Sequence, residues 1–309
     1  MADFPWVSVC GFGAHIKTTQ KSLLIQKNNT LEEYPLDQVK NFLVVGGHTI
    51  SSTVILKLVK NGAFVSFFEA DGTPIGIVRP FRDYPDEDMG EIQKTIPRQR
   101  FAISLARGAI KSRLSAIGRV EEKKNIRLFY EGELDLLYKS EEELGFLIKL
   151  DEIRRLHRLT SDMYYEILSR QLPAEFGFKR RTVRPQLDPV NAMLSFGYAM
   201  LFGNCNVAIV GSRLNPDLGV IQDGRGSLVY DLMDPLKAEM IDPVVFSIAG
   251  ESLTSTDFET TLDRCILSDE LIKKLVCLFQ ASIRKDRIDE QVYNFTRSIR
   301  NNEEFRVLY

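Results

Sequence analysis

The chain has 309 residues, of which 44% are hydrophobic and 27% charged, and its 40 Lys and Arg against 42 Asp and Glu give a formal net charge of −2 at pH 7. These are the values of an ordinary globular protein, so they exclude a disordered, collagen-like or disulfide-scaffold chain. The length suits about two domains. Because the net charge is small, a polyanion would have to be bound by local basic patches.

The cysteines and histidines restrict the chemistry further. No C-x-x-C pair and no zinc-like spacing is present, so reduced thiols are expected, and a mechanism that needs several histidines is excluded. The opening residues lack a basic signal region, and no window reaches the roughly 18 consecutive apolar residues of a membrane span. We therefore expect a cytoplasmic protein without membrane contact. The cysteines are Cys10, Cys205, Cys265 and Cys277, and the histidines are His15, His48 and His157.

Residues 1–84 are expected to form a small β-rich domain. Apolar runs with β character predict its strands, and Thr53 to Lys60 predicts one helix that ends at Asn61 and Gly62. Short apolar strands of this kind indicate packing on a second domain or on a second copy of the chain. The strands are predicted over residues 6–10, 22–26, 32–36, 41–45, 63–68 and 75–78.

An acidic connector follows this domain. Asp83 to Glu91 contains a proline, a glycine and five acidic residues, a composition typical of a solvated linker. We place the linker at residues 85–96 and a larger domain at residues 97–309, because apolar residues recur at helical spacing from there onward.

Two basic stretches of the helical domain are candidate DNA-binding surfaces. Between Lys94 and Arg127 there are ten Lys or Arg and two acidic residues, and the loop from Phe176 to Arg181 combines aromatic with basic side chains. Each stretch suits phosphate contacts and base stacking, but each also suits an ordinary solvated face. The sequence alone leaves both interpretations open.

Three segments of the second half of the chain have distinct patterns. Asp188 and Pro189 predict the N-cap and first turn of a long apolar helix. A glycine-rich loop covers residues 219–226, and the residues that follow it up to Asp231 are predicted as a short β-like segment. Asp231 would then cap the next helix with Asp234 three residues later, a capping arrangement that requires no metal.

These segments resemble the CRISPR-associated spacer integrase family over nearly the whole chain. The resemblance implies an α+β fold, in which a small N-terminal β-sandwich-like domain that dimerises is followed by a larger all-α catalytic domain. It also implies insertion of DNA spacers into a CRISPR array together with a small ferredoxin-like partner protein. The segments that carry it are residues 43–46, 49–51, 62–65 and 98–111, and above all Asp188-Pro189-Val190-Asn191-Ala192-Met193-Leu194-Ser195-Phe196-Gly197-Tyr198-Ala199, Asn215-Pro216-Asp217-Leu218-Gly219 and Asp231-Leu232-Met233.

The chemistry implied by the resemblance is metal-assisted phosphodiester cleavage and strand transfer, with a glutamate, a histidine and a carboxylate around one divalent ion. Such ligands suit Mg²⁺ or Mn²⁺, which stabilises charge on the attacked phosphate. Here the glutamate position holds His157, the histidine position holds Gln222, and the carboxylate position holds Asp234. These three are the candidate catalytic residues, and together with Asp231 they are the candidate metal ligands.

Since only the acidic ligand is kept, alternative functions stay open. The chain would be a DNA endonuclease and integrase with an altered metal site, a non-catalytic DNA-binding scaffold of the same fold, or a relative from a mobile-element integrase lineage. Loss of an acidic ligand should weaken Mg²⁺ binding more than Mn²⁺ binding. The first two hypotheses both retain DNA binding, and the residues expected to contact DNA are Lys111, Arg158, Lys179, Arg180, Arg181 and Arg184.

Overall fold

The computed structural model describes residues 6–27, 30–80, 89–183 and 186–309. Its N-terminal part is a six-stranded mixed sheet in the order β3-β2-β1-β4-β5-β6. Strands β1 and β5 pair in parallel with β4, and the other neighbours are antiparallel. The strands are β1 (Trp6–Thr18), β2 (Ser22–Lys27), β3 (Thr30–Pro35), β4 (Asn41–Ile50), β5 (Phe64–Phe68) and β6 (Pro74–Val78).

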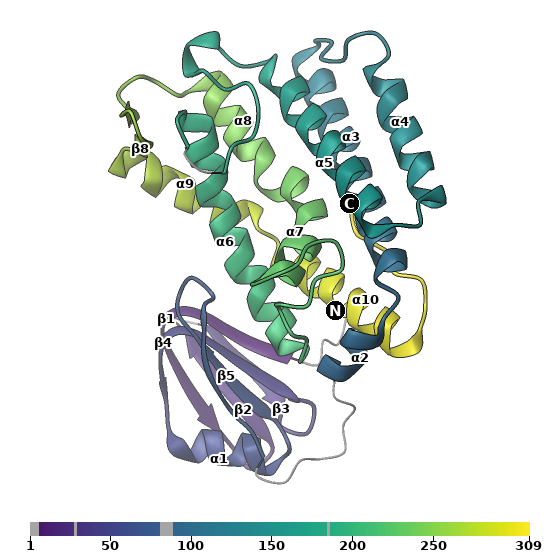
Figure 1. The fold of residues 1–309 in the computed structure, drawn as a ribbon. Coiled ribbons are helices and arrows are strands. Elements are labelled where there is room, and N and C mark those ends of the chain that lie inside the picture. The colour runs from purple at the N-terminus through teal and green to yellow at the C-terminus, as the bar shows by residue number, and fades with distance from the viewer. Residues whose placement is uncertain (1–5, 28–29, 81–88, 184–185) are drawn as a thin grey trace.

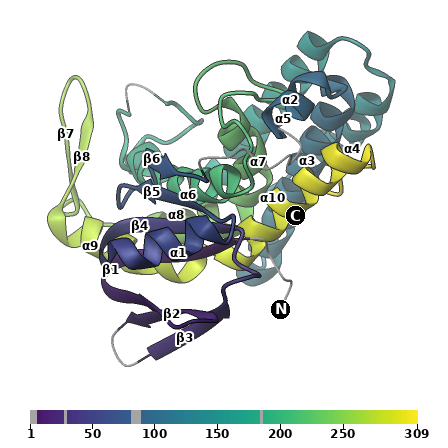
Figure 2. The ribbon, with the colours of Figure 1, turned by 90° about the horizontal axis from the view of Figure 1, so that it is seen from below.

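Strand β4 is apolar at its start because both faces of the sheet are covered. Phe42 packs in one hydrophobic cluster with Leu58 of helix α1 (Ser52–Lys60). Leu43 and Val45 point the other way, as alternation along a strand requires, and join the core of the helical domain. The sheet therefore lies between α1 and the helices, as Figures 1 and 2 show.

The helical domain is built around two long helices. Helix α3 packs against α5 and α7, and helix α6 packs against α7, α8, α9 and α10. The helices are α2 (Met89–Thr95), α3 (Arg98–Lys124), α4 (Glu133–Glu143), α5 (Leu150–Ser169), α6 (Pro189–Gly211), α7 (Ser227–Met240), α8 (Asp242–Glu251), α9 (Asp269–Ser282) and α10 (Lys285–Asn301), with short 3₁₀ turns at Leu144–Phe146 and Ala174–Phe176.

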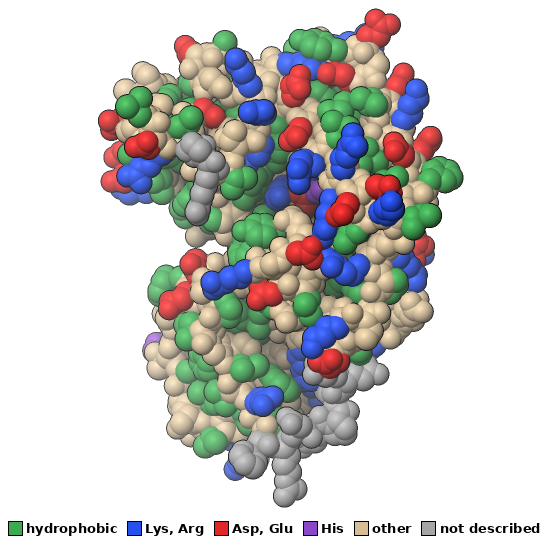
Figure 3. All heavy atoms as spheres, in the orientation of Figure 1, with side chains coloured by type: hydrophobic (Ala, Val, Ile, Leu, Met, Phe, Trp, Pro, Cys, Tyr) green, Lys and Arg blue, Asp and Glu red, His purple; other side chains and the backbone are tan. Residues whose placement is uncertain are grey.

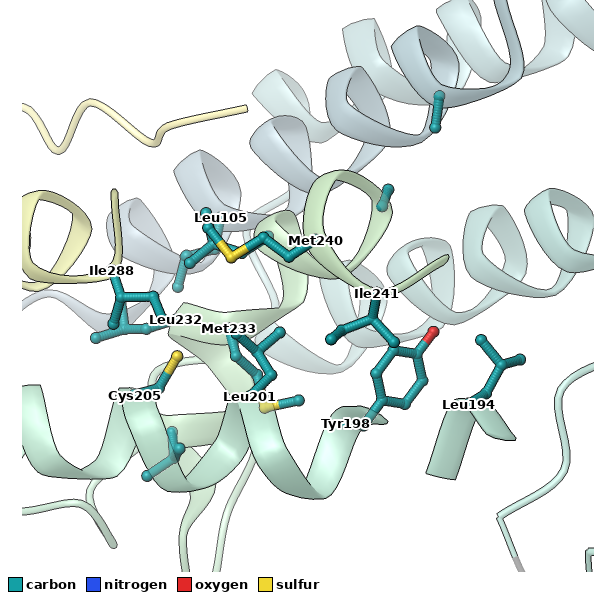
Figure 4. Packing of buried hydrophobic residues seen from close by; sticks show 14 of the residues in the cluster. Leu105, Leu194, Tyr198, Leu201, Cys205, Leu232, Met233, Met240, Ile241 and Ile288 are labelled. Atoms are coloured by element: carbon teal, nitrogen blue, oxygen red, sulfur yellow. The ribbon is translucent and has the colours of Figure 1, made fainter. Parts of the chain in front are cut away.

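Helix α6 is the core helix of this domain. Its Leu201 and Cys205 pack against Leu232 of α7 and Ile288 of α10 (Figure 4). Among the described residues it is the one helix long and apolar enough to cross a membrane, but 61% of its most apolar window is buried inside the protein. Its hydrophobicity is explained by this packing.

The expected α+β class is confirmed, since a β-rich domain precedes a larger helical one. The strands form one mixed sheet rather than two separate sheets, and the helix predicted at residues 53–60 is α1. The cap at the start of α6 is confirmed as well, because the Asp188 carboxylate accepts the Asn191 N–H at 2.7 Å.

Several details differ from the expectation, while the domain boundaries themselves stay predictions. The expected linker contains α2, and its residues 85–88 lie outside the described part of the chain. A hairpin of β7 (Phe258–Thr260) and β8 (Cys265–Leu267) extends from the helical domain (Figure 2). The helical domain is therefore not purely α as expected. The two short strands pair with each other, so their backbone N–H and C=O groups form hydrogen bonds without a larger sheet.

The expected capping role of Asp231 and Asp234 is wrong. Helix α7 begins at Ser227, so residues 227–231 are helical rather than β-like, and the left-handed N-cap residue is Gly226. Both aspartates therefore lie inside the helix and are buried. Since buried carboxylates require partners, their surroundings decide what they do.

Candidate functional site

The centre of the candidate site is Asp234, a buried aspartate on α7. Its Oδ2 accepts hydrogen bonds from Arg113 Nη2 at 2.7 Å and from His157 Nε2 at 2.9 Å. Its Oδ1 accepts from Lys237 Nζ at 2.8 Å, one turn later on the same helix. We call these four residues the Asp234 cluster. Helices α3, α5 and α7 contribute to it, and the packing of α3 against the other two brings the side chains together.

The charges of this cluster favour an ionised aspartate. Burial opposes the charge of Asp234, but the positive charges of Arg113 and Lys237, with the hydrogen bond from His157, hold its pKa well below the usual range. The side chains of Arg113 and His157 are only 7% and 14% exposed. Asp234 is therefore a desolvated anion surrounded by donors, and removing it would leave cationic groups buried without a counter-charge.

Asp231, one turn earlier on α7, has a different role. Its carboxylate accepts backbone N–H bonds from Val220 at 2.7 Å, Ile221 at 2.9 Å and Gln222 at 3.2 Å. Burial raises its pKa to about 6, although these three bonds work against the shift. A Cβ atom on Gly219 would stand 2.7 Å from Asp231 Oδ2, so the loop needs glycine there to approach the carboxylate. Asp231 thus organises the glycine-rich loop.

Two arginines hold the same loop from outside. Arg98 Nη2 donates to Asp223 Oδ1 at 2.7 Å and to the Gln222 carbonyl at 3.3 Å. Arg154 of α5 donates to the Ile221 carbonyl and also to Asp223. Gln222 is exposed, and its hydrogen bonds in this network are made by its backbone. The glycine-rich loop is therefore held in place by hydrogen bonds and ion pairs from α3 and α5.

The structure brings together some of the candidate residues and separates others. His157 and Asp234 are in direct contact, whereas Asp231 and Gln222 belong to the loop network. The sequence analysis missed two members of the Asp234 cluster. Lys237 could have been found, because it is three residues from Asp234 on one helix. Arg113 had a weaker signal, a charge that falls between Ile110 and Ile117 on an apolar helix face.

The Asp234 cluster does not fit a divalent ion. Both carboxylate oxygens of Asp234 already accept from cations or from His157. Arg113 Nη1 is also buried without a hydrogen-bond partner among the described residues. In the part of the chain that the structure describes, no three His, Cys, Asp or Glu side chains are grouped to hold a metal. Mg²⁺ and Mn²⁺ sites need several oxygen ligands and a net negative charge, and this cluster offers neither.

The residues expected to contact DNA fall into two classes. Arg158, Lys179 and Arg180 are exposed. Lys111 forms an ion pair with Glu141 at 3.2 Å, and Arg181 donates to Asn191 Oδ1 and Ser195 Oγ of α6, both at 2.9 Å. Arg184 lies outside the described residues. The exposed class makes no ion pair within the described part of the chain, so it can reach a phosphate without breaking one there.

The face drawn in Figure 3 shows where charges gather. Lys and Arg side chains surround a hollow in the upper, helical half, with a histidine visible inside it. The Asp234 cluster itself holds two cationic side chains, Arg113 and Lys237, for one carboxylate, which is a setting suited to a phosphate-rich ligand.

Comparison with known proteins gives a consistent result. The family model of CRISPR associated protein Cas1 matches residues 7–281. The chain is 40% identical over 300 residues to a putative CRISPR-associated endonuclease Cas1 of Methanospirillum hungatei, covering 96% of this chain and 99% of that protein. Its fold is similar to a casposase bound to integration product, with TM-score 0.82, 17% identity and coverage of 98% and 99%. It is also similar to a chain of a partial Cas6-RT-Cas1–Cas2 complex, with TM-score 0.80, 19% identity and coverage of 98% for both.

Proposed function

The chain belongs to the family of CRISPR associated protein Cas1. We propose first that it acts in CRISPR adaptation as a DNA-binding protein of the endonuclease and integrase kind. The second part of the proposal is that its Asp234 cluster keeps Mg²⁺-dependent cleavage weak. The single observation that supports the second part is the occupation of both Asp234 oxygens by Arg113, His157 and Lys237. A divalent ion would have to displace buried cations from their counter-charge. Mn²⁺ accepts imidazole more readily than Mg²⁺, so the weak residual cleavage should be higher in Mn²⁺ than in Mg²⁺.

The test restores the ligand types that the resemblance implies. The double variant His157→Glu with Gln222→His should gain Mn²⁺ binding by calorimetry and metal-dependent cleavage of a labelled duplex over the parent. Adding Asp234→Asn should remove both gains, because one of the two carboxylate ligands of the restored set is lost. A matched control, His15→Glu with Gln20→His, makes the same changes at two exposed positions of the N-terminal domain and should gain neither. A parent that cleaves fully in Mg²⁺ and is indifferent to Asp234→Asn would contradict the proposal.

The partners of this function are DNA, a second copy of the chain and a small ferredoxin-like protein, and the setting is the cytoplasm. The second copy is supported by edge strand β6, where Ile75 and Ile77 are 63% and 54% exposed. Exposed apolar edge strands are prone to association. Light scattering of the full chain should give a dimer that Ile77→Lys shifts toward monomer, whereas Leu262→Lys in the loop between β7 and β8 should leave the mass unchanged.

A further inference from the structure

A cavity of the helical domain lies between α3, α5 and α8, and none of the four residues of the Asp234 cluster lines it. Its volume is about 240 Å³. Val120 of α3, Leu168 of α5 and Phe246 of α8 are among the residues that form its apolar walls. Pockets for drug-sized ligands are about 300–1,000 Å³, so this cavity suits something smaller, the size of one planar ring system.

Polar groups occupy the inner end of this cavity. Tyr164 donates its hydroxyl to Asp242 Oδ2 at 2.9 Å, and both residues line the cavity. Gln171 lines it too, and its Nε2 is buried without a hydrogen-bond partner among the described residues. A buried amide donor without a partner is unfavourable, and a ligand carbonyl or ring nitrogen would satisfy it.

The rim of the cavity is positively charged. Arg119, Lys123 and Lys124 from the last turns of α3 line it, against Glu251 at the end of α8. Lys123 and Glu251 form an exposed ion pair at 3.5 Å, which leaves an excess of positive charge at the entrance. Exposed pairs of this kind contribute little stability and are readily exchanged for a stronger anion such as phosphate.

We propose that this cavity binds one nucleotide, with its base between Val120 and Phe246, a base acceptor on Gln171 Nε2, and its phosphate on Lys123 and Lys124. The apolar walls match a base face, the unpartnered amide matches a base edge, and the basic rim matches a phosphate. The nucleotide comes either from solution or from a strand of bound DNA. The second source rests on the proposed function, whereas the first does not.

The free-nucleotide arm uses calorimetry of the full chain with dAMP, dCMP, dGMP and dTMP, and with deoxyribose 5-phosphate as a ligand without a base. At least one mononucleotide should bind, and the sugar phosphate should bind at least tenfold more weakly. Gln171→Leu should lower affinity about tenfold, because the donor is lost while the side-chain volume is kept. Gln38→Leu, an exposed glutamine of the N-terminal domain, is the matched control.

Two further variants test the walls and the rim. Val120→Phe fills the cavity and should abolish nucleotide binding, with an unchanged circular dichroism spectrum as the fold control. Lys123→Ala with Lys124→Ala should weaken binding and reduce its salt dependence, whereas the exposed pair Lys60→Ala with Lys273→Ala should not. Gln171→Leu keeps the proposal testable if Val120→Phe does not fold.

The DNA arm separates the two sources. A series of duplexes with single-stranded ends carries one 2-aminopurine each, at successive positions. If one base of bound DNA enters the cavity, the fluorescence of 2-aminopurine should change at that position with the parent protein. The same change should be absent with Gln171→Leu. A signal in this arm assigns the site to bound DNA, and binding of mononucleotides without it assigns the site to free nucleotide. Failure of DNA binding would overturn the proposed function while the mononucleotide arm still reports on the cavity. No binding in either arm, or binding that Val120→Phe leaves unchanged, would overturn the inference.

Discussion

Two buried carboxylates on successive helices differ in the partners that surround them. Asp234 of α7 is paired with Arg113 and Lys237, and these charges hold its pKa well below the usual range despite burial. Asp242 of α8 accepts hydroxyl bonds from Tyr164 at 2.9 Å and Tyr198 at 2.5 Å, and burial raises its pKa. Similar burial therefore accompanies opposite shifts of the two pKa values. A neighbouring cation compensates a buried carboxylate for its lost hydration, whereas a neutral hydroxyl does so only in part.

The largest effect on the free energy of unfolding is expected when Asp234, the ion-paired carboxylate, is removed. Asp234→Ala should lower the free energy of unfolding by about 3–5 kcal/mol, since buried Arg113 and Lys237 lose their counter-charge. Urea unfolding followed by circular dichroism measures it. A loss below about 1 kcal/mol would mean that the cluster is solvated and that the comparison with Asp242 does not hold.

The pH dependence of Asp231 should produce the next largest effect. Its pKa is about 6 in the folded protein, above the value of about 4 expected in the unfolded chain, so the folded state binds more protons between these pH values. Stability from this group should therefore fall by about 3 kcal/mol in total as pH rises from well below 4 to well above 6, and about 2 kcal/mol of this loss falls between pH 4 and 6. The depressed pKa of Asp234 acts below this window, where stability is lost as pH falls.

The measurement is the difference in unfolding free energy between the parent and Asp231→Asn across pH 4 to 7. The asparagine cannot ionise, so its curve should be flatter in this window, although it accepts fewer of the loop N–H bonds. Parallel curves would show that Asp231 has an ordinary pKa.

A smaller effect on the free energy of unfolding is expected from substitution of Asp242, the carboxylate paired with tyrosine hydroxyls. Asp242→Asn keeps an acceptor for one tyrosine hydroxyl and removes no buried ion pair, so we expect a loss of about 1–2 kcal/mol in unfolding free energy. Asp234→Asn, measured beside it, should cost more, because its amide faces cationic donors. Equal losses from the two asparagine variants would remove the distinction between cation and hydroxyl partners.

The smallest effect is expected from exposed cations of the loop between α5 and α6. Lys179 and Arg180 are exposed, unlike Arg113 and Lys237, and no ion pair joins them to another described residue, so they can contact phosphate directly. Lys179→Ala with Arg180→Ala should reduce the slope of log affinity against log salt for duplex DNA by about 1.8, at about 0.9 per contact. Fluorescence anisotropy measures the slope, and Lys60→Ala with Lys273→Ala is the control. An unchanged slope would take this loop out of the DNA path.

Much of the fold could be predicted from local patterns. The apolar strand from Asn41, the α1 helix and the Asp188 cap were all readable, because period, propensity and capping act over a few residues. The start of α7 was missed, since Gly226 in a left-handed conformation caps it without a side chain. The helix at residues 89–95 was also missed, where Gln93 is buried by hydrogen bonds to the Asn215 carbonyl at 3.0 Å and the Leu218 carbonyl at 2.8 Å.

The sequence by itself determined the class of the protein, the family that it resembles and the residue types at three ligand positions, including His157 in place of a glutamate. Only the tertiary structure decided what those residues do. Arg113 is 121 positions from Asp234 along the chain, and the packing of α3 on α7 brings them within 2.7 Å. Desolvation and charge pairing depend on such long-range contacts, so the state of a buried carboxylate cannot be read from its neighbours in sequence.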